Sequence, residues 1–138
     1  MSGCVFCEII AGRAEASVVH EDGDVVAVMD LNPATVGHVL VMPRVHAAGL
    51  AGTDDAAGAA IWRTARRISG ALRTSGIPCD GVRWSLADGE AAGQDVLHLH
   101  LHVVPRYPGD GVVVTADGKR RSRALLDQDA ALIRRSLT

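Results

Sequence analysis

The stretch Leu97-His98-Leu99-His100-Leu101-His102-Val103-Val104 alternates aliphatic residues with histidines. Successive side chains of a strand point to opposite faces, so the three histidines would share one face and the aliphatic residues the other. The face expected to pack in the core is formed by Leu97, Leu99, Leu101 and Val103. A row of imidazoles fills a core poorly, because each has two ring nitrogens that need partners when buried. The spacing therefore indicates a functional face.

Two kinds of chemistry use such a face. Histidines two apart on a strand can chelate a metal ion, and neutral imidazole can act as a nucleophile or transfer protons. The preceding loop, residues 89–96, is small and interrupted by glycines, so its backbone N–H groups can approach an anion. A metal site does not need such a loop, which favours phosphate chemistry on an imidazole. A metalloenzyme using His98, His100 and His102 together stays the weaker alternative.

The loop and triad, residues 92–106, resemble the histidine triad (HIT) family of nucleotide hydrolases and nucleotidyl transferases, in its bacterial Hit/Hint-like branch. Further blocks resemble the family in order and spacing, and they span residues 4–12, 25–29, 30–33, 37–38 and 43–46. The resemblance thus covers nearly the whole chain. Because several independent blocks occur in the family's order, it is far more specific than the triad alone.

The resemblance implies a role for each matching residue. His100 matches the nucleophile that attacks the α-phosphorus to give a nucleotidyl-histidine, which water then hydrolyses. His102 and His38 match histidines that stabilise charge on the phosphate oxygens. Asp30 matches the acidic residue that holds the ribose hydroxyls. The remaining nucleotide-binding positions are Gly93, Gln94 and Asp95 beside the phosphate, and Phe6, Ile9, Val28 and Leu31 around the base, where core packing is the competing role.

Cys4 and Cys7 form a C-x-x-C pair. That spacing alone also suits small buried side chains or a redox pair. The resemblance implies a structural zinc site made by the two cysteines with His46 and His98, a Cys₂His₂ set. Zinc would then have no part in the chemical step. Cys79 is assigned to packing only.

Two positions depart from the family pattern. Ala87 stands where many members have an amide that contacts the phosphate, and one such hydrogen bond to a charged group contributes about 1.5–3 kcal/mol. Asp88 beside it has the wrong charge for that contact. Asp95 stands where Ser or Thr is common, and its carboxylate is expected to point away from a phosphate while its backbone N–H serves it. Both changes put the rate in doubt more than the type of reaction.

Composition sets the remaining expectations. A chain of 138 residues with 48% hydrophobic residues suits one domain, residues 1–138, with its own core. The net charge of −2 gives no indication of a nucleic-acid or membrane partner. The chain shows neither a membrane-spanning apolar run nor a signal pattern, so a cytoplasmic location is expected. Three cysteines argue against a disulfide framework.

The expected fold is α+β and HIT-like, with a five-stranded antiparallel sheet, one long helix, a short N-terminal helix and a C-terminal helix. The expected strands cover residues 18–20, 25–29, 38–42, 81–86 and 96–104. The expected helices cover residues 4–10, the stretch from an N-cap at Thr53 to Thr74, and residues 124–137. The resemblance implies a homodimer through the long helix and a sheet edge, which would cover an exposed edge strand.

The sequence therefore predicts a nucleotide-binding hydrolase. It would cleave the α-phosphate bond of a purine nucleoside monophosphate conjugate, such as an AMP phosphoramidate, an aminoacyl-adenylate or a dinucleoside polyphosphate. The alternative is a nucleotide-binding or protein-interaction module with little turnover, which Ala87 and Asp95 keep open.

Overall fold

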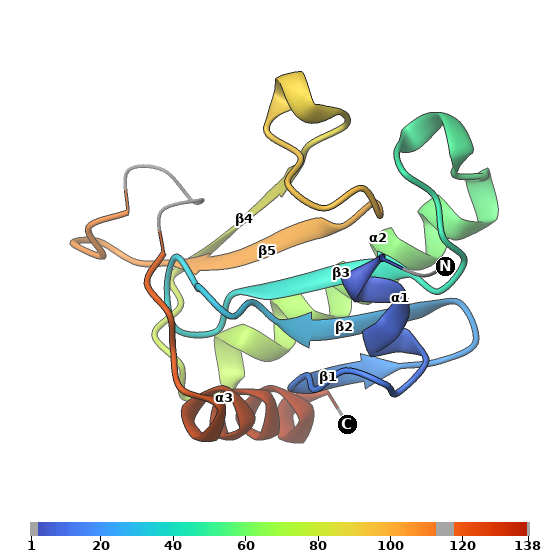
Figure 1. Ribbon diagram of the computed structural model, residues 1–138. Helices are drawn as coiled ribbons and strands as arrows, with labels where there is room; N and C mark the ends of the chain where they lie inside the picture. The colour runs from blue at the N-terminus through green and yellow to red at the C-terminus, as the bar shows by residue number, and fades with distance from the viewer. Residues whose placement is uncertain (1–2, 113–117, 138) are drawn as a thin grey trace.

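A computed structural model describes residues 3–112 and 118–137 (Figure 1). Five strands form one antiparallel sheet in the order β1-β2-β3-β5-β4. The strands are β1 (Val18–Glu21), β2 (Val25–Met29), β3 (Val39–Pro43), β4 (Gly81–Leu86) and β5 (Leu101–Arg106), and the α-helices are α1 (Val5–Ile10), α2 (Asp55–Thr74) and α3 (Arg123–Ser136). The predicted α+β fold with its antiparallel sheet is confirmed.

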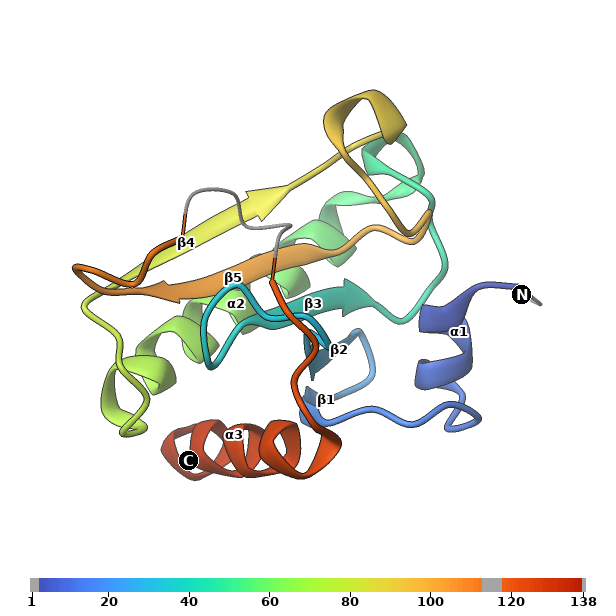
Figure 2. The same ribbon diagram turned by 60° about the vertical axis from the view of Figure 1, so that its left-hand side comes forward.

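The sheet separates two apolar layers (Figures 1 and 2). Helices α2 and α3 cover one face, where the main core joins aliphatic residues of the strands to Ile68, Leu72 and Ile133. Helix α1 lies against the other face, where Phe6 packs in a smaller cluster with Leu40. Burial of apolar surface on both faces holds the sheet in place. His98 and His100 pack against Phe6 on the face that α1 covers.

The histidine run is less regular than the alternation predicts. Strand β5 begins at Leu101 rather than at residue 96, because β3 and β4 pair with it only from that residue onward. Leu97 is therefore 50% exposed instead of lying in the core, whereas Leu99 is 1% exposed. His98 and His100 lie in the irregular segment before the strand, and both are nevertheless buried.

Helix α2 confirms the predicted apolar stripe, since Ile61, Ala65, Ile68 and Leu72 are all buried. Its N-cap is Asp54 rather than Thr53: the Asp54 carboxylate accepts a hydrogen bond from the Ala57 N–H at 2.8 Å. The arginines expected on the solvated face are indeed exposed, namely Arg63, Arg66, Arg67 and Arg73.

Helix α3 begins one residue earlier than predicted, after an N-cap at Ser122. Ile133 is buried as expected, and Leu132 packs at the edge of the main core. The pattern of the C-terminal helix predicts a core contact for Leu125, and this prediction is wrong. Leu125 is 41% exposed, while the next residue, Leu126, is fully buried.

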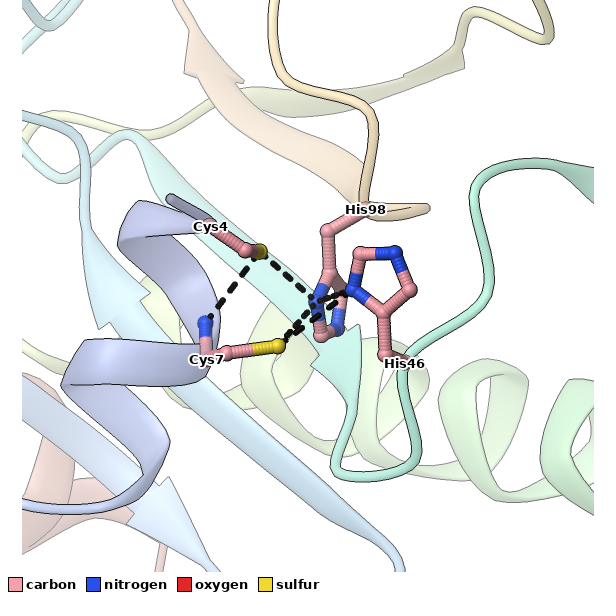
Figure 3. Close-up of side chains that lie close together, drawn as sticks. All are labelled: Cys4, Cys7, His46 and His98. Carbon is pink, nitrogen blue, oxygen red and sulfur yellow. Dashed lines mark hydrogen bonds between the residues drawn. The ribbon is translucent and has the colours of Figure 1, made fainter. Parts of the chain in front are cut away.

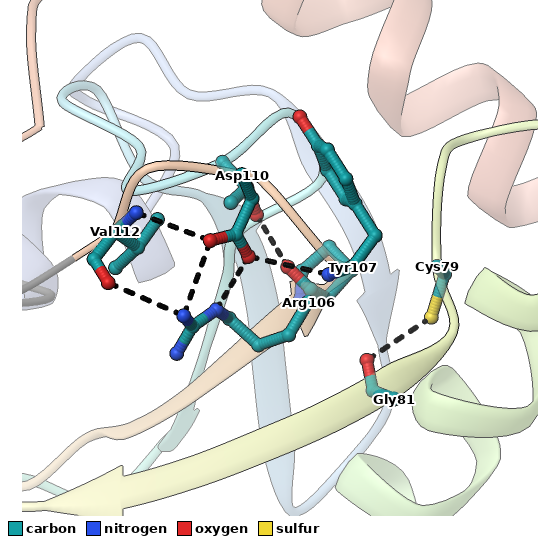
Figure 4. A network of polar contacts seen from close by, with 8 residues as sticks. Cys79, Gly81, Arg106, Tyr107, Asp110 and Val112 are labelled. Carbon is teal, nitrogen blue, oxygen red and sulfur yellow. Dashed lines mark hydrogen bonds and ion pairs between the residues drawn. The ribbon is translucent and has the colours of Figure 1, made fainter.

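The end of β5 is held by an arginine–carboxylate fork (Figure 4). Arg106 donates to both carboxylate oxygens of Asp110, at 2.6 and 3.2 Å. The hydrogen bond from Arg106 keeps the pKa of Asp110 well below its ordinary value, and the backbone N–H of Val112 adds to this effect. The fork closes the turn that follows the last residue of the strand.

The three cysteines are free thiols, which agrees with the absence of a disulfide framework. Cys79 packs against the main core, and its S–H group donates to the carbonyl oxygen of Gly81 at 3.4 Å (Figure 4). Among the described residues, none of the helices has the length and apolar character needed to cross a bilayer.

Candidate active site and metal centre

A cavity of about 230 Å³ opens between α1, the end of β2 and the histidine run. Of the predicted site residues, it brings together Phe6, Ile9, Val28, Asp30, Leu31, Asp95, His100 and His102. His38, Gly93 and Gln94 do not line it. An apolar slot with a few convergent polar groups is the usual form of a small-molecule site.

His38 and His102 form a hydrogen-bonded pair whose tautomers follow from the backbone. The Ala34 N–H donates to His38 Nδ1 at 3.0 Å, so that nitrogen is unprotonated and the ring carries its proton on Nε2. His38 Nε2–H then donates to His102 Nδ1 at 2.9 Å. His102 must therefore hold its own proton on Nε2. The pair thus places an N–H donor of His102 at the cavity.

The tautomer of His100 is set by the main chain as well. Its Nδ1 lies 2.8 Å from the carbonyl oxygen of His98, so Nδ1–H donates to that carbonyl. Nε2 is left with a free lone pair. The ring also packs against the edge of Phe6, with the ring centroids 5.0 Å apart. An oriented neutral imidazole with a free Nε2 is what nucleophilic attack requires.

The loop before β3 positions His38. Thr35 Oγ1 donates to the Pro105 carbonyl at 2.7 Å, which ties this loop to β5. The His38 N–H donates to the Thr35 carbonyl, and the Asp30 N–H donates to the His38 carbonyl. Asp30 Oδ2 lies 3.5 Å from His38 Nε2. The acidic residue and the two histidines are therefore held as one unit.

The pKa of His38 is lowered to about 4, mainly by burial and to a smaller extent by the nearby His102 and His100, against the opposing effect of the Asp30 carboxylate. Burial also lowers the pKa of His102, with a smaller contribution from His100. Both rings are therefore neutral at pH 7, in agreement with the tautomers that the hydrogen bonds require.

The glycine-containing loop is shaped by Gln94. Its buried side-chain amide accepts from the Gly89 N–H at 2.7 Å and donates to the carbonyls of Ala48 and Val96. The amide is therefore fully used in closing the loop, and only the backbone of Gln94 could serve a nucleotide. Gly93 adopts φ +96°, a conformation that favours glycine.

Asp95 differs from the expectation that its side chain points away. Its Oδ1 lies 3.5 Å from His100 Nε2, although the side chain is 78% exposed. A carboxylate therefore stands where an incoming phosphate would meet the lone pair of His100. Asp88, by contrast, accepts from the Leu50 N–H at 3.1 Å and is tied to another loop. Neither acid replaces the amide that is absent at Ala87.

Four further side chains bring their donor atoms together (Figure 3). One donor atom from each of Cys4, Cys7, His46 and His98 lies within 4.8 Å of the others. Cys4 is the N-cap of α1 and Cys7 lies in its first turn, His46 follows β3, and His98 precedes β5. Two thiols and two imidazoles suit a tetrahedral zinc ion.

The orientation of His98 supports this fit. Its Nε2–H donates to the Pro43 carbonyl at 2.8 Å, which leaves the Nδ1 lone pair facing Cys4 Sγ at 3.5 Å and Cys7 Sγ at 3.6 Å. Fixing the second ring nitrogen of a ligand by a backbone carbonyl is typical of metal sites. These residues could hold a metal ion.

Among the residues that line the cavity without being part of the sequence prediction, two are charged: Glu15 and Arg123. Glu15 belongs to the connection between α1 and β1, and Arg123 is the first residue of α3. No local pattern marks either residue, because only the packing of α3 beside β1 brings them together.

The HIT domain model matches residues 11–109. An uncharacterised HIT-like protein of Mycobacterium tuberculosis is 39% identical, over 93% of this chain and 96% of its own length. The adenylylsulfatase HINT3 of Arabidopsis thaliana is 32% identical, over 93% of this chain and 64% of its own length.

Solved structures are similar in fold over almost the whole chain. A Zn-bound histidine triad family protein from Mycobacterium smegmatis has a TM-score of 0.88 and 37% identity, covering 98% of this chain and 93% of its own. A hypothetical histidine triad nucleotide-binding protein from Sulfolobus tokodaii has a TM-score of 0.87 and 28% identity, covering 97% of this chain and 91% of its own.

The hydrogen bonds predict the protonation state of each ring. Nitrogen-detected NMR of the folded protein at pH 7 should show His38 and His102 as neutral Nε2–H tautomers and His100, in its neutral form, as the Nδ1–H tautomer. His38 should stay neutral until the pH approaches about 4.

The lowered pKa of His38 also makes the stability of the folded chain depend on pH. The pKa of His38 is lower in the folded chain than the ordinary value of 6.5, so protonation favours the unfolded state. Its contribution to stability is complete above pH 6.5 and is lost as the pH falls toward 4. A His38 that titrates near 6.5, or that holds its proton on Nδ1, would contradict this geometry.

Proposed function

The chain belongs to the HIT family, and from that premise we propose that it hydrolyses the α-phosphate bond of a nucleoside monophosphate conjugate through a nucleotidyl-histidine on His100. The observation that carries the proposal is the free Nε2 of His100, whose other ring nitrogen is held by the His98 carbonyl. Asp30 and His102 line the same cavity.

In the first step, His100 Nε2 attacks the α-phosphorus and the bond from phosphorus to the leaving group breaks. The electron pair departs with the leaving group, which then takes up a proton from solvent. The His100 ring keeps its Nδ1–H and becomes positively charged. The His98 carbonyl, which already accepts that N–H, stabilises this charge. In the second step, water attacks phosphorus and releases a proton to solvent, the P–N electron pair returns to His100 Nε2, and His100 becomes neutral again.

His102 and His38 act on the charge that develops on the phosphate. The Nε2–H of His102 is the available donor, and its Nδ1 accepts from His38 Nε2–H. The carboxylate of Asp30 lies 3.5 Å from His38 Nε2, where its negative charge stabilises positive charge on the two histidines. Such donors contribute most when they are already oriented before the reaction.

The substrate class is a purine nucleotide such as an AMP conjugate. The Arabidopsis relative is named as an adenylylsulfatase, which supports an adenylyl group linked to an acidic leaving group. The Sulfolobus relative is described as a nucleotide-binding protein, which supports nucleotide binding here. The competing function is a binding module with little turnover, which is favoured by Asp95 standing in front of His100.

We further propose that Cys4, Cys7, His46 and His98 hold a structural zinc ion, a proposal that the Zn-bound relative from Mycobacterium smegmatis supports. The ion would supply a cross-link between α1 and the histidine run. The chain is proposed to be one cytoplasmic domain.

A homodimer through α2 and the edge strand β4 fits the exposed surface there. Trp62 is 55% exposed, and its ring lies 6.3 Å from that of Trp84 on β4. Pairing of two copies would cover both the aromatic ring and the open strand edge.

The central test is His100→Ala assayed on adenosine phosphoramidate. We expect a loss of at least about a thousandfold in turnover, roughly 4 kcal/mol of transition-state stabilisation, in a protein that still folds. His102→Ala should cost less, because it removes charge stabilisation but leaves the covalent route open. His20→Ala is the control, since that ring bonds to Asp22 away from the cavity. A His100→Ala variant that keeps more than about a tenth of the rate refutes the mechanism.

Asp95→Ser should make turnover faster. The change removes a negative charge from the place where the phosphate approaches His100, so we expect a gain of about three- to tenfold, up to roughly 1.4 kcal/mol. Glu90→Gln is the matched control, because it removes a charge from the same exposed loop. Steady-state kinetics of the three proteins would decide this. Unchanged turnover in Asp95→Ser would show that the carboxylate does not impede the phosphate, and slower turnover would show that it contributes to the reaction.

Metal analysis tests the zinc proposal. Protein purified without chelator should contain about one zinc per chain, and the double variant Cys4→Ser, Cys7→Ser should lose it together with several degrees of melting temperature. Cys79→Ser, outside the donor group, should keep the metal. Zinc retained in full by the double variant would overturn the assignment, and zinc lost only when His100 is changed would favour a metalloenzyme.

A further inference from the structure

The nucleotide cavity contains a charged pair that the proposed chemistry does not use. Glu15 and Arg123 both line it, and Arg123 Nε donates to Glu15 Oε1 at 2.6 Å. The Glu15 side chain is 71% exposed, whereas that of Arg123 is 28% exposed. The pair is therefore anchored on the arginine side and open on the carboxylate side.

Arg123 is held in place from behind. Its Nη1 donates to Ser17 Oγ at 2.8 Å, and the Ser17 hydroxyl donates to Asp127 Oδ1 at 2.6 Å. The guanidinium has more N–H donors than these contacts use. A preorganised guanidinium with unused donors at the wall of an apolar cavity is suited to recognise the polar edge of a ligand.

Main-chain bonds place this pair next to the residues proposed to hold the ribose. The Met29 N–H donates to the Ser17 carbonyl at 2.9 Å, and the Arg121 N–H donates to the Leu31 carbonyl at 3.0 Å. The segments that carry the pair thus flank Asp30 on both sides. A nucleotide with its phosphate at His100 and its ribose at Asp30 would direct its base toward this part of the cavity.

The geometry points to a base-selecting role: Glu15 and Arg123 recognise the edge of guanine, so that the enzyme acts on guanosine monophosphate conjugates in preference to adenosine ones. This inference rests on the proposed function and names its substrate more closely. The base would stack between the apolar walls formed by Phe6, Ile9 and Leu31. The charged pair would meet its polar edge.

Guanine has hydrogen-bonding groups that are complementary to both Glu15 and Arg123. Guanine presents two adjacent donors, N1–H and the 2-amino group, which suit the two oxygens of one carboxylate, and it presents acceptors at O6 and N7, which suit a guanidinium. Adenine has an unprotonated N1, which a carboxylate repels, and an amino group where guanine has O6. A site that forms hydrogen bonds to one group of a ligand discriminates against an analogue that lacks this group, because the polar groups of the site are then left unpaired.

Calorimetric binding of GMP, IMP and AMP to the full-length chain tests the inference without turnover. We expect GMP to bind at least fivefold more tightly than AMP. IMP, which lacks the 2-amino group, should lie between them. Glu15→Gln should reduce the preference for GMP over AMP below twofold while changing AMP affinity less than threefold. The same order should appear in kcat/KM for guanosine and adenosine phosphoramidates.

Glu8→Gln is the matched control. Glu8 also pairs with an arginine, Arg13, in the same region of the chain, but neither lines the cavity. This variant should keep the wild-type preference. A general loss of charge or stability would affect both variants alike, whereas base recognition would affect Glu15→Gln alone.

The outcomes separate the two proposals. Binding and His100-dependent turnover with less than a fivefold preference for guanine, or a preference that survives Glu15→Gln, overturn the base assignment and leave the hydrolase intact. If no nucleotide binds and neither phosphoramidate is cleaved, the proposed function fails and the base assignment fails with it.

Discussion

The hydrogen bond from His100 Nδ1–H to the His98 carbonyl is the contact on which the site depends. It determines which nitrogen of His100 is free, and it aims that nitrogen into the cavity. The bond joins two residues of one short segment, so its geometry depends on how the segment is held. His98 provides that hold, because its ring is buried and donates to the Pro43 carbonyl at the end of β3. The orientation of His100, the proposed nucleophile, therefore depends on a residue of the group formed by Cys4, Cys7, His46 and His98.

Helix α1 connects the cavity to the group of cysteines and histidines. Helix α1 carries Cys4 at its N-cap and Cys7 in its first turn, and the same helix supplies Phe6 and Ile9 to the cavity. A metal ion bound by the cysteines would fix the helix against the histidine run, and with it one wall of the nucleotide site. With only a few residues, α1 is too short to be stable alone. The small apolar cluster around Phe6 compensates for this.

Charged side chains surround the histidines without taking part in the hydrogen bonds that hold the rings. The histidines are held by main-chain groups and by each other. Asp95 changes the charge in front of His100, and Glu15 with Arg123 adds a polar edge to an apolar cavity. The carboxylates of Asp95 and Glu15 are largely exposed, so changing either should cost little stability.

The sequence by itself determined the histidine and cysteine groups, the antiparallel sheet and the amphipathic long helix. These features follow from residue types and from local periodicity, which the sequence shows directly. Only the tertiary structure decided that Leu97 is exposed, since residues 96–100 have no strand partner. It likewise decided that the Gln94 amide closes its own loop and that Asp95 faces His100. The pairing of Glu15 with Arg123 has no local signal at all. It arises because α3 packs beside β1, and contacts between distant segments follow from packing of the whole chain rather than from the pattern of either segment.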